Sequence, residues 1–147
     1  MPDSNSGPVR ILFADDDRGF RTLGEMQLKG AGFDVTTAVD GVDAMEKLEG
    51  GTFDLLLLDI LMPGATGWEV LSHAVDRTPV GEPLPHVLMV TGFQSEFVLD
   101  VDMLSREGAA GLLLKPFSGD VFISEVQRVL EMEPLRARPR TPEPAAS

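Results

Sequence analysis

Four short apolar runs, each followed at once by polar side chains, constrain this chain more than any other feature of its sequence. The polar groups are three carboxylates, a hydroxyl and an amine: Asp15 and Asp16 after residues 11–14, Asp59 after 55–58, Thr91 after 87–90 and Lys115 after 112–114. Such apolar runs are typical of strands that are buried on both faces of a parallel sheet. Because ligands bind beyond the carboxyl ends of such strands, we expect these polar groups to converge at one edge.

Strand-like and helix-like segments alternate along the chain. Strands are expected at residues 9–14, 33–38, 53–58, 87–90 and 112–114, and helices at 18–31, 41–48, 68–75, 95–107 and 119–131. This strict alternation implies right-handed crossovers and a doubly wound α/β sheet. In the first helix, four apolar residues roughly follow helical spacing: Phe20, Leu23, Met26 and Leu28.

Length, composition and charge limit the possible partners. The 147 residues correspond to one domain, expected at 9–132 between a flexible N-terminal tail (1–8) and a Pro-rich flexible C-terminal tail (133–147). A net charge of −12 argues against nucleic-acid binding, and no apolar run is long enough to span a membrane. The chain has no Cys and no signal-like N-terminus, so we expect a cytoplasmic protein.

The chemistry of the polar groups points to phosphate. Clustered carboxylates repel one another unless a cation lies among them, and oxygen ligands without His or Cys suit Mg²⁺ or Mn²⁺. An ammonium and a hydroxyl nearby would complete a cradle for a phosphoryl group, and a carboxylate inside that cradle can form an acyl phosphate. Asp59 stands alone after the central strand and is therefore the expected nucleophile. Asp17 is expected to cap the first helix.

Four segments in this order resemble a bacterial response-regulator receiver domain: residues 11–17, 58–63 with Gly67, 90–92 and 114–117. The resemblance implies a flavodoxin-like sheet of order 2-1-3-4-5 with five helices. It also implies that Asp59 takes a phosphoryl group from the phosphohistidine of a histidine kinase or phosphotransfer protein. Such a protein is a signalling phosphoacceptor that catalyses its own phosphorylation and dephosphorylation, and is not a conventional enzyme.

The same resemblance assigns the other site residues. Asp16, Asp59 and the backbone carbonyl of Leu61 would hold the metal ion directly, and Asp15 would act largely through water. Thr91 and Lys115 would contact oxygens of the phosphoryl group. A downstream protein would bind the last two helices and the last strand, and an apolar stripe on the helix expected at 95–107 would also suit a homodimer.

One position departs from the family pattern. An aromatic residue commonly stands three positions before the lysine, where this chain has Leu112. Leu112 therefore leaves open a receiver-like scaffold that takes no phosphate. Residues 15–17 also contain a D-x-D pair after the first strand, so a haloacid-dehalogenase-like phosphohydrolase with Asp15 as the nucleophile stays open as well. We expect a stand-alone receiver, a phosphorelay shuttle or a receiver cut from a longer protein.

Overall fold

Strands and helices alternate along the chain, as the sequence predicts. A computed structural model describes residues 7–92, 108–115 and 117–138. The strands are β1 (Arg10–Ala14), β2 (Asp34–Ala38), β3 (Leu55–Asp59), β4 (His86–Thr91) and β5 (Gly111–Leu114). The helices are α1 (Arg18–Gly30), α2 (Gly41–Glu49), α3 (Gly67–Arg77) and α5 (Gly119–Leu130). The helix expected at 95–107 lies outside the described residues.

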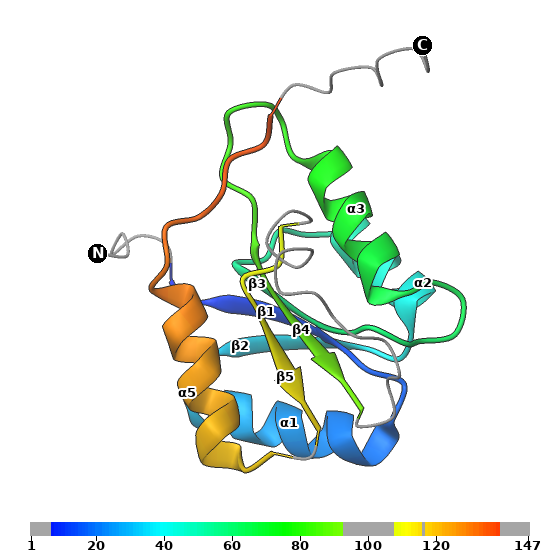
Figure 1. The fold of residues 1–147 in the computed structure, drawn as a ribbon, viewed down its shortest axis with the longest axis vertical. Coiled ribbons are helices and arrows are strands. Elements are labelled where there is room, and N and C mark those ends of the chain that lie inside the picture. The colour runs from blue at the N-terminus through cyan, green and yellow to red at the C-terminus, as the bar shows by residue number, and fades with distance from the viewer. Residues whose placement is uncertain (1–6, 93–107, 116, 139–147) are drawn as a thin grey trace.

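All neighbouring strands pair in parallel, in the order β2-β1-β3-β4-β5. This order confirms the predicted flavodoxin-like arrangement. Helices α1 and α5 cover one face of the sheet, and α2 and α3 cover the other (Figure 1). Because both faces are covered, residues 11–14 of β1 and 55–58 of β3 are fully buried. Among the described helices, none is both long and apolar enough to cross a membrane.

Two of the four apolar positions expected on α1 face solvent. Leu23 and Met26 are 54% and 65% exposed. The face that packs on the sheet carries Phe20, Gly24 and Leu28, which recur every four residues. At Gly24 an added Cβ would overlap the ring of Phe13. The helix therefore approaches β1 closely because that position has no side chain.

Side-chain caps fix where two helices begin after the loops at the carboxyl edge of the sheet. Asp17 caps α1 as predicted, since its Oδ1 accepts a hydrogen bond from the backbone N–H of Phe20 at 3.1 Å. Thr66 and Glu69 form a reciprocal capping box at the start of α3. These caps satisfy N–H groups that a helix cannot satisfy itself, and they fix the chain on leaving each loop.

Residues 133–138, here called the C-terminal strap, lie along the loop between α3 and β4. The N–H of Leu84 donates to the carbonyl of Leu135 at 2.7 Å, and the N–H of Ala137 donates to the carbonyl of Glu82 at 2.9 Å. Ala137 is buried. Residues 133–147 were expected to form a flexible tail. The strap is instead held by backbone hydrogen bonds, which leave no apolar periodicity in the sequence.

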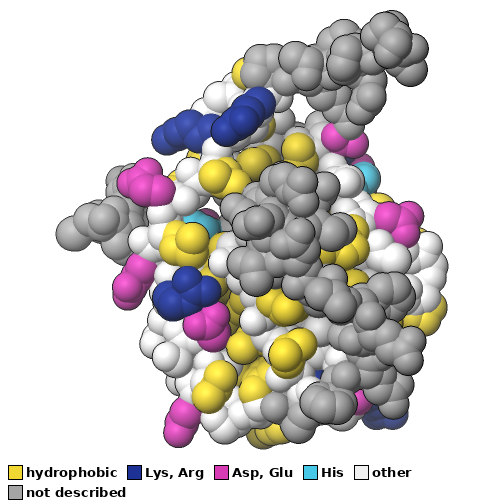
Figure 2. All heavy atoms as spheres, viewed as in Figure 1, with side chains coloured by type: hydrophobic (Ala, Val, Ile, Leu, Met, Phe, Trp, Pro, Cys, Tyr) yellow, Lys and Arg dark blue, Asp and Glu magenta, His cyan; other side chains and the backbone are white. Residues whose placement is uncertain are grey.

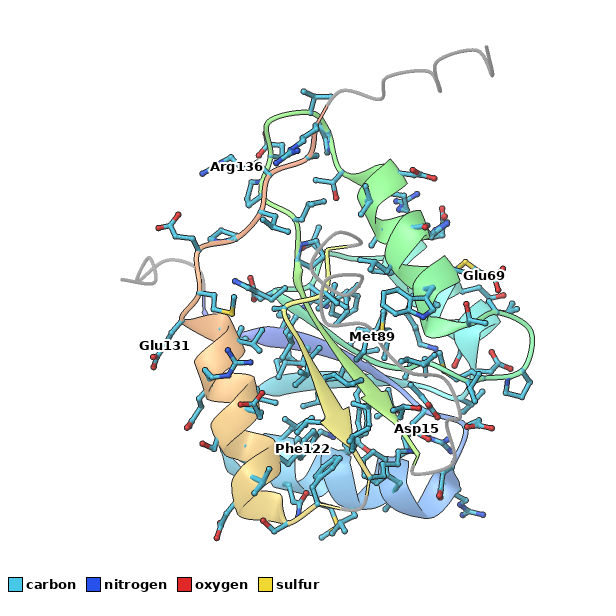
Figure 3. All side chains as sticks on the ribbon, in the orientation of Figure 1. Asp15, Glu69, Met89, Phe122, Glu131 and Arg136 are labelled. Atoms are coloured by element: carbon cyan, nitrogen blue, oxygen red, sulfur yellow. The ribbon has the colours of Figure 1, made fainter. Side chains whose placement is uncertain are left out.

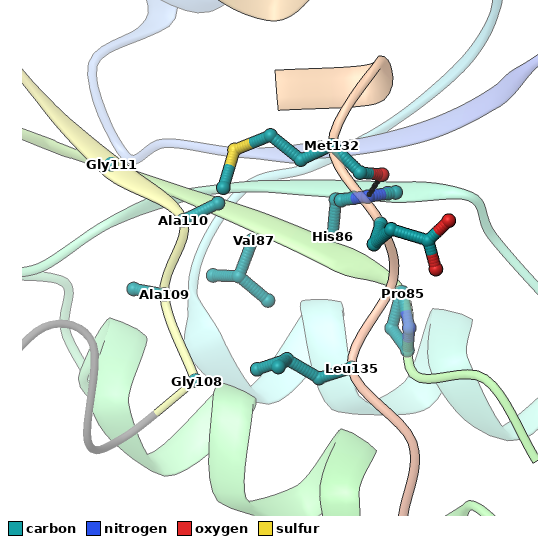
Figure 4. Close-up of a pocket in the computed structure, with 10 residues that line it drawn as sticks. Pro85, His86, Val87, Gly108, Ala109, Ala110, Gly111, Met132 and Leu135 are labelled. Carbon is teal, nitrogen blue, oxygen red and sulfur yellow. Dashed lines mark hydrogen bonds between the residues drawn. The ribbon is translucent and has the colours of Figure 1, made fainter. Parts of the chain in front are cut away.

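The strap closes a cavity of about 220 Å³ at the amino ends of β4 and β5 (Figure 4). A hydrogen bond between His86 Nε2 and the carbonyl of Met132, 2.8 Å long, joins β4 to the residue before the strap.

Figure 3 shows Arg136 of the strap and Asp15 at opposite ends of the molecule. On the face seen in Figure 2, the acidic side chains of the described residues lie scattered and are not gathered in one place.

Candidate functional site

The predicted site residues meet at the carboxyl edge of the sheet. Asp15 directly follows β1, Asp59 ends β3, Thr91 ends β4 and Lys115 directly follows β5. The parallel register sets Asp59 beside Val90 and Thr91 beside Leu114, so the strand ends are level with one another. Figure 3 shows Asp15 at the end of the sheet toward which the arrows of β4 and β5 point.

Three carboxylates form a compact acidic cluster. Asp15, Asp16 and Asp59 each offer an oxygen atom, and these atoms lie within 4.8 Å of one another. Asp15 is fully buried and Asp59 is 6% exposed, whereas Asp16 faces solvent. The cluster is therefore a shallow site with one open side.

Lys115 provides the positive charge beside this cluster. Its Nζ lies 2.7 Å from Asp15 Oδ2 and 3.7 Å from Asp59 Oδ2. The contact with Asp15 is an ion pair without the alignment of a hydrogen bond, because Asp15 Oδ2 makes no hydrogen bond within the described part of the chain. The same ammonium lies 4.3 Å from the centre of the Phe20 ring.

Backbone N–H groups hold the remaining carboxylate oxygens. The N–H of Asp17 donates to Asp15 Oδ1 at 2.8 Å, and the N–H of Leu61 donates to Asp59 Oδ1 at 3.3 Å. Each carboxylate is thus oriented by the loop that follows it. Asp59 has the longer hydrogen bond and the longer ion pair, so it is the less tightly held of the two.

The environment of Asp59 favours the protonated acid. Burial raises the pKa of Asp59 to about 6, and the charge of Asp15 adds to this effect. Lys115 and the N–H of Leu61 oppose the rise in pKa without cancelling it. Burial also raises the pKa of Asp15, with Lys115 as the main opposing influence. Two buried carboxylates therefore share one ammonium, which leaves the cluster short of positive charge.

These features fit a hard divalent cation. The donors are all oxygen atoms, and one oxygen each from Asp15, Asp16 and Asp59 lies within 4.8 Å of the others, with a single ammonium beside them. Mg²⁺ prefers oxygen ligands and usually takes one or two carboxylates together with water. Asp16 and Asp59, with Asp15 nearby, satisfy that requirement. The backbone carbonyl of Leu61 remains a predicted ligand; the Leu61 side chain is 53% exposed.

Thr91 and Lys115 are joined through the backbone. The N–H of Lys115 donates to the carbonyl of Thr91 at 2.8 Å, and Thr91 is 2% exposed.

Leu112 packs with the core cluster beneath α2 and α3, which contains Leu56, Val70, Leu71 and Met89. It therefore lies on the face of β5 opposite α1 and α5.

Two residues beside the site were not singled out from the sequence. Arg21 Nη1 donates to the backbone carbonyl of Asp15 at 2.7 Å and so braces the loop after β1. Phe20 lies beneath the ammonium of Lys115. The sequence feature that could have drawn attention to both residues is their position in the first turn of the expected helix, directly after the acidic triplet. Phe20 was expected only as one of the apolar positions of that helix.

Gly67, which the sequence motif includes, allows α3 to start against the backbone of Asp59. A Cβ at this position would lie 2.6 Å from the carbonyl oxygen of Asp59. The small residue is therefore needed where the helix meets the end of β3.

Comparison with known proteins agrees with this geometry. The family model described as "Response regulator receiver domain" matches residues 11–127. The Regulator of RpoS of Escherichia coli (strain K12) is 34% identical over 123 residues, which are 84% of this chain and 33% of that protein. The alkaline phosphatase synthesis transcriptional regulatory protein PhoP of Bacillus subtilis (strain 168) is 32% identical over 130 residues, 87% of this chain and 51% of that protein.

Solved structures give the same result. The response regulator TrrA of Thermotoga maritima, in complex with Mg²⁺-BeF, has a TM-score of 0.67 and 29% identity, covering 82% of this chain and 98% of that one. The chemotaxis response regulator CheY4 of Vibrio cholerae has a TM-score of 0.69 and 27% identity, covering 83% and 98%.

This chain spans about a third to a half of the length of the two curated relatives named above. The match to the family model covers most of the chain and includes every residue of the site. It gives no support to the alternative of a haloacid-dehalogenase-like phosphohydrolase. The chain belongs to the family of response-regulator receiver domains, the signalling modules of two-component systems.

Proposed function

We propose that this protein accepts a phosphoryl group on Asp59 from the phosphohistidine of a histidine kinase or phosphotransfer protein. The observation that carries the proposal is the position of the Asp59 carboxylate at the end of β3. It is nearly buried, belongs to an acidic cluster and lies 3.7 Å from the ammonium of Lys115. A phosphoryl group on this oxygen would lie beside the Lys115 ammonium and beside the carboxylates that could hold a metal ion.

Asp59 is a better acceptor than Asp15. The Asp15 side chain has no exposed surface, contacts Lys115 at 2.7 Å and accepts a hydrogen bond from the N–H of Asp17. The Asp59 side chain is 8% exposed, and its contacts are longer. An in-line attack needs an oxygen with a free lone pair and an accessible approach, and the longer contacts and partial exposure of Asp59 meet these needs better than the fully buried Asp15 does.

The transfer is a displacement at phosphorus. An oxygen of Asp59 forms the new O–P bond while the N–P bond of the phosphohistidine breaks, and the nitrogen keeps the electron pair of that bond. Lys115 would pair with one phosphoryl oxygen, and the Thr91 hydroxyl would donate to another. Both roles rest on their neighbouring positions at the ends of β4 and β5.

Mg²⁺, or Mn²⁺ in its place, would be held by Asp16, Asp59 and the carbonyl of Leu61, with Asp15 acting through water. The ion would neutralise charge on the transferred group. The bound Mg²⁺-BeF of the Thermotoga maritima relative supports this assignment.

The phosphorylated protein would signal by contact with a downstream target. Leu114 at the end of β5 and Val121 on α5 are 54% and 47% exposed, which gives the last strand and last helix apolar side chains to offer a partner. The other helix of the expected surface, at 95–107, lies outside the described residues. A homodimer through this surface is the alternative output.

Incubation with Mg²⁺ and acetyl phosphate, followed by intact mass measurement, tests the acceptor. We expect one added phosphoryl group, its loss on chelation of the metal, and no addition to Asp59→Ala. Asp54→Ala is the matched control, because Asp54 lies at the other end of β3 and faces solvent. Persistent phosphorylation of Asp59→Ala would overturn the assignment, and a wild-type protein that takes no phosphate would favour the scaffold alternative.

A further inference from the structure

The ammonium of Lys115 lies over an aromatic ring as well as beside two carboxylates. Its Nζ is 4.3 Å from the centre of the Phe20 ring, within the range of a cation–π interaction. The Lys115 side chain is 18% exposed, so water only partly screens this contact. A partly desolvated ammonium is drawn more strongly to a ring face than a fully hydrated one.

The Phe20 ring is itself held in place. Phe13 packs against it edge to face, with centroids 5.8 Å apart at 73°, and Phe117 does the same at 5.4 Å and 85°. Phe122 adds a tilted contact at 6.4 Å. Edge-to-face neighbours on a ring restrict its rotation and leave its face directed at one place. The ring is therefore a fixed surface and not a passing contact.

We infer that Phe20 is a positioning residue for Lys115, and that its ring holds the ammonium where it can reach a phosphoryl group on Asp59. Lysine carries its charge on a flexible four-carbon stem. In this site Asp15 attracts the ammonium more closely than Asp59 does, at 2.7 Å against 3.7 Å. The ring supplies a third point of contact, so the ammonium does not depend on Asp15 alone.

The role toward phosphate rests on the proposed function, whereas the placement of Lys115 over Phe20 does not. The competing explanation is that Phe20 only fills space. Phe117 separates the two explanations, because it belongs to the same aromatic cluster. Among the described residues, Phe20 alone has the Lys115 ammonium over its ring.

The first experiment needs no phosphate. The ε-methylene protons of Lys115 are measured by NMR in wild type, Phe20→Leu, Phe20→Tyr and Phe117→Leu. A ring beneath the ammonium shifts these protons upfield, and we expect the shift to vanish in Phe20→Leu and to persist in the other two variants. Phe20→Met replaces Phe20→Leu if the leucine variant does not fold. An unchanged shift in the apolar variant would overturn the placement.

The second experiment measures the rate of phosphorylation by acetyl phosphate with Mg²⁺. Loss of the ring should slow Phe20→Leu about fivefold, the equivalent of ~1 kcal/mol at 1.4 kcal/mol per tenfold. Phe20→Tyr should restore the rate. Phe117→Leu removes one ring packed on Phe20 but leaves the Phe20 ring itself, so it should lose much less than Phe20→Leu. Equal rates in all four proteins, or an equal loss in Phe117→Leu, would overturn the positioning role.

The two proposals can fail separately. A wild-type protein that takes no phosphate on Asp59 would refute the proposed function and with it the role of Phe20 toward phosphate. The proton shift of Lys115 would still decide whether the ring holds the ammonium. A phosphorylated wild type with the same rate as Phe20→Leu would refute the further inference alone.

Discussion

Replacing Asp59 with Asn should stabilise the folded protein near neutral pH when no metal is present. Burial, with the charge of Asp15, raises the pKa of Asp59 from 3.8 to about 6. The folded state therefore binds a proton at Asp59 more tightly than the unfolded chain does. Such a group lowers stability when the pH exceeds the folded pKa, and the penalty disappears as the pH falls through the folded and then the unfolded value. Asparagine removes the charge while keeping the shape of the side chain.

The size of the effect follows from the pKa shift. A rise from 3.8 to about 6 is roughly two units, which is about 3 kcal/mol at 1.36 kcal/mol per unit. Part of the shift is shared with Asp15, and the variant leaves Lys115 with one carboxylate fewer. We therefore expect a gain of about 1–3 kcal/mol in the free energy of unfolding near pH 7.5. Near pH 4 the same relation gives a gain of only about 0.5 kcal/mol in the free energy of unfolding.

Urea unfolding of wild type and Asp59→Asn in a chelator, at both pH values, measures this difference. Asp54→Asn is the control because Asp54 is exposed just before the opposite end of β3, and the amide oxygen of Asn can still accept the hydrogen bond from the N–H of Arg10; its change should stay within about 0.5 kcal/mol. Mg²⁺ should stabilise the wild type more than Asp59→Asn and so narrow the gap. The reasoning is refuted if Asp59→Asn gains nothing near neutral pH, or gains equally at both pH values.

Three further predictions follow from the site and its supports. On the proposed mechanism Asp59 attacks as a carboxylate, so the rate of phosphorylation at low Mg²⁺ should fall below a pH of about 6, and the midpoint should move lower as Mg²⁺ is added; a pH–rate profile that is flat from about 5 to 8 would contradict this. Gly67→Ala should lose roughly 1–3 kcal/mol of stability, because its Cβ would lie 2.6 Å from the Asp59 carbonyl oxygen. Gly30→Ala is the control for the same urea assay and should be near neutral, because open space surrounds that position. Thr66→Ala should lose about 1 kcal/mol with the capping box and Thr66→Ser should retain it, as thermal unfolding would show.

The parallel sheet could be predicted because its inner strands are buried on both faces, whereas the order of its strands was implied by the resemblance to receiver domains. An unbroken apolar run is then the only sequence compatible with the strand, and the residue after the run must be the one at the edge. Asp15, Asp59 and Lys115 meet for that reason, each placed by its own local sequence. The strap could not be predicted in this way, because backbone hydrogen bonds hold it and Ala137 is the one buried side chain within it.

Gly24 explains why the sequence did not reveal the contact between Phe20 and Lys115. Apolar spacing counts glycine as a gap, and the apolar positions that it marks on α1 include the exposed Leu23 and Met26. In the structure the gap is the point of closest approach, where the ring of Phe13 lies against the backbone of α1. Phe20, one turn earlier on the same face, is thereby brought against Phe13 and beneath the ammonium that follows β5. The carboxylates and the ammonium of the site are each placed by their own strand, whereas the position of the Phe20 ring beneath Lys115 depends on how closely α1 can approach the sheet.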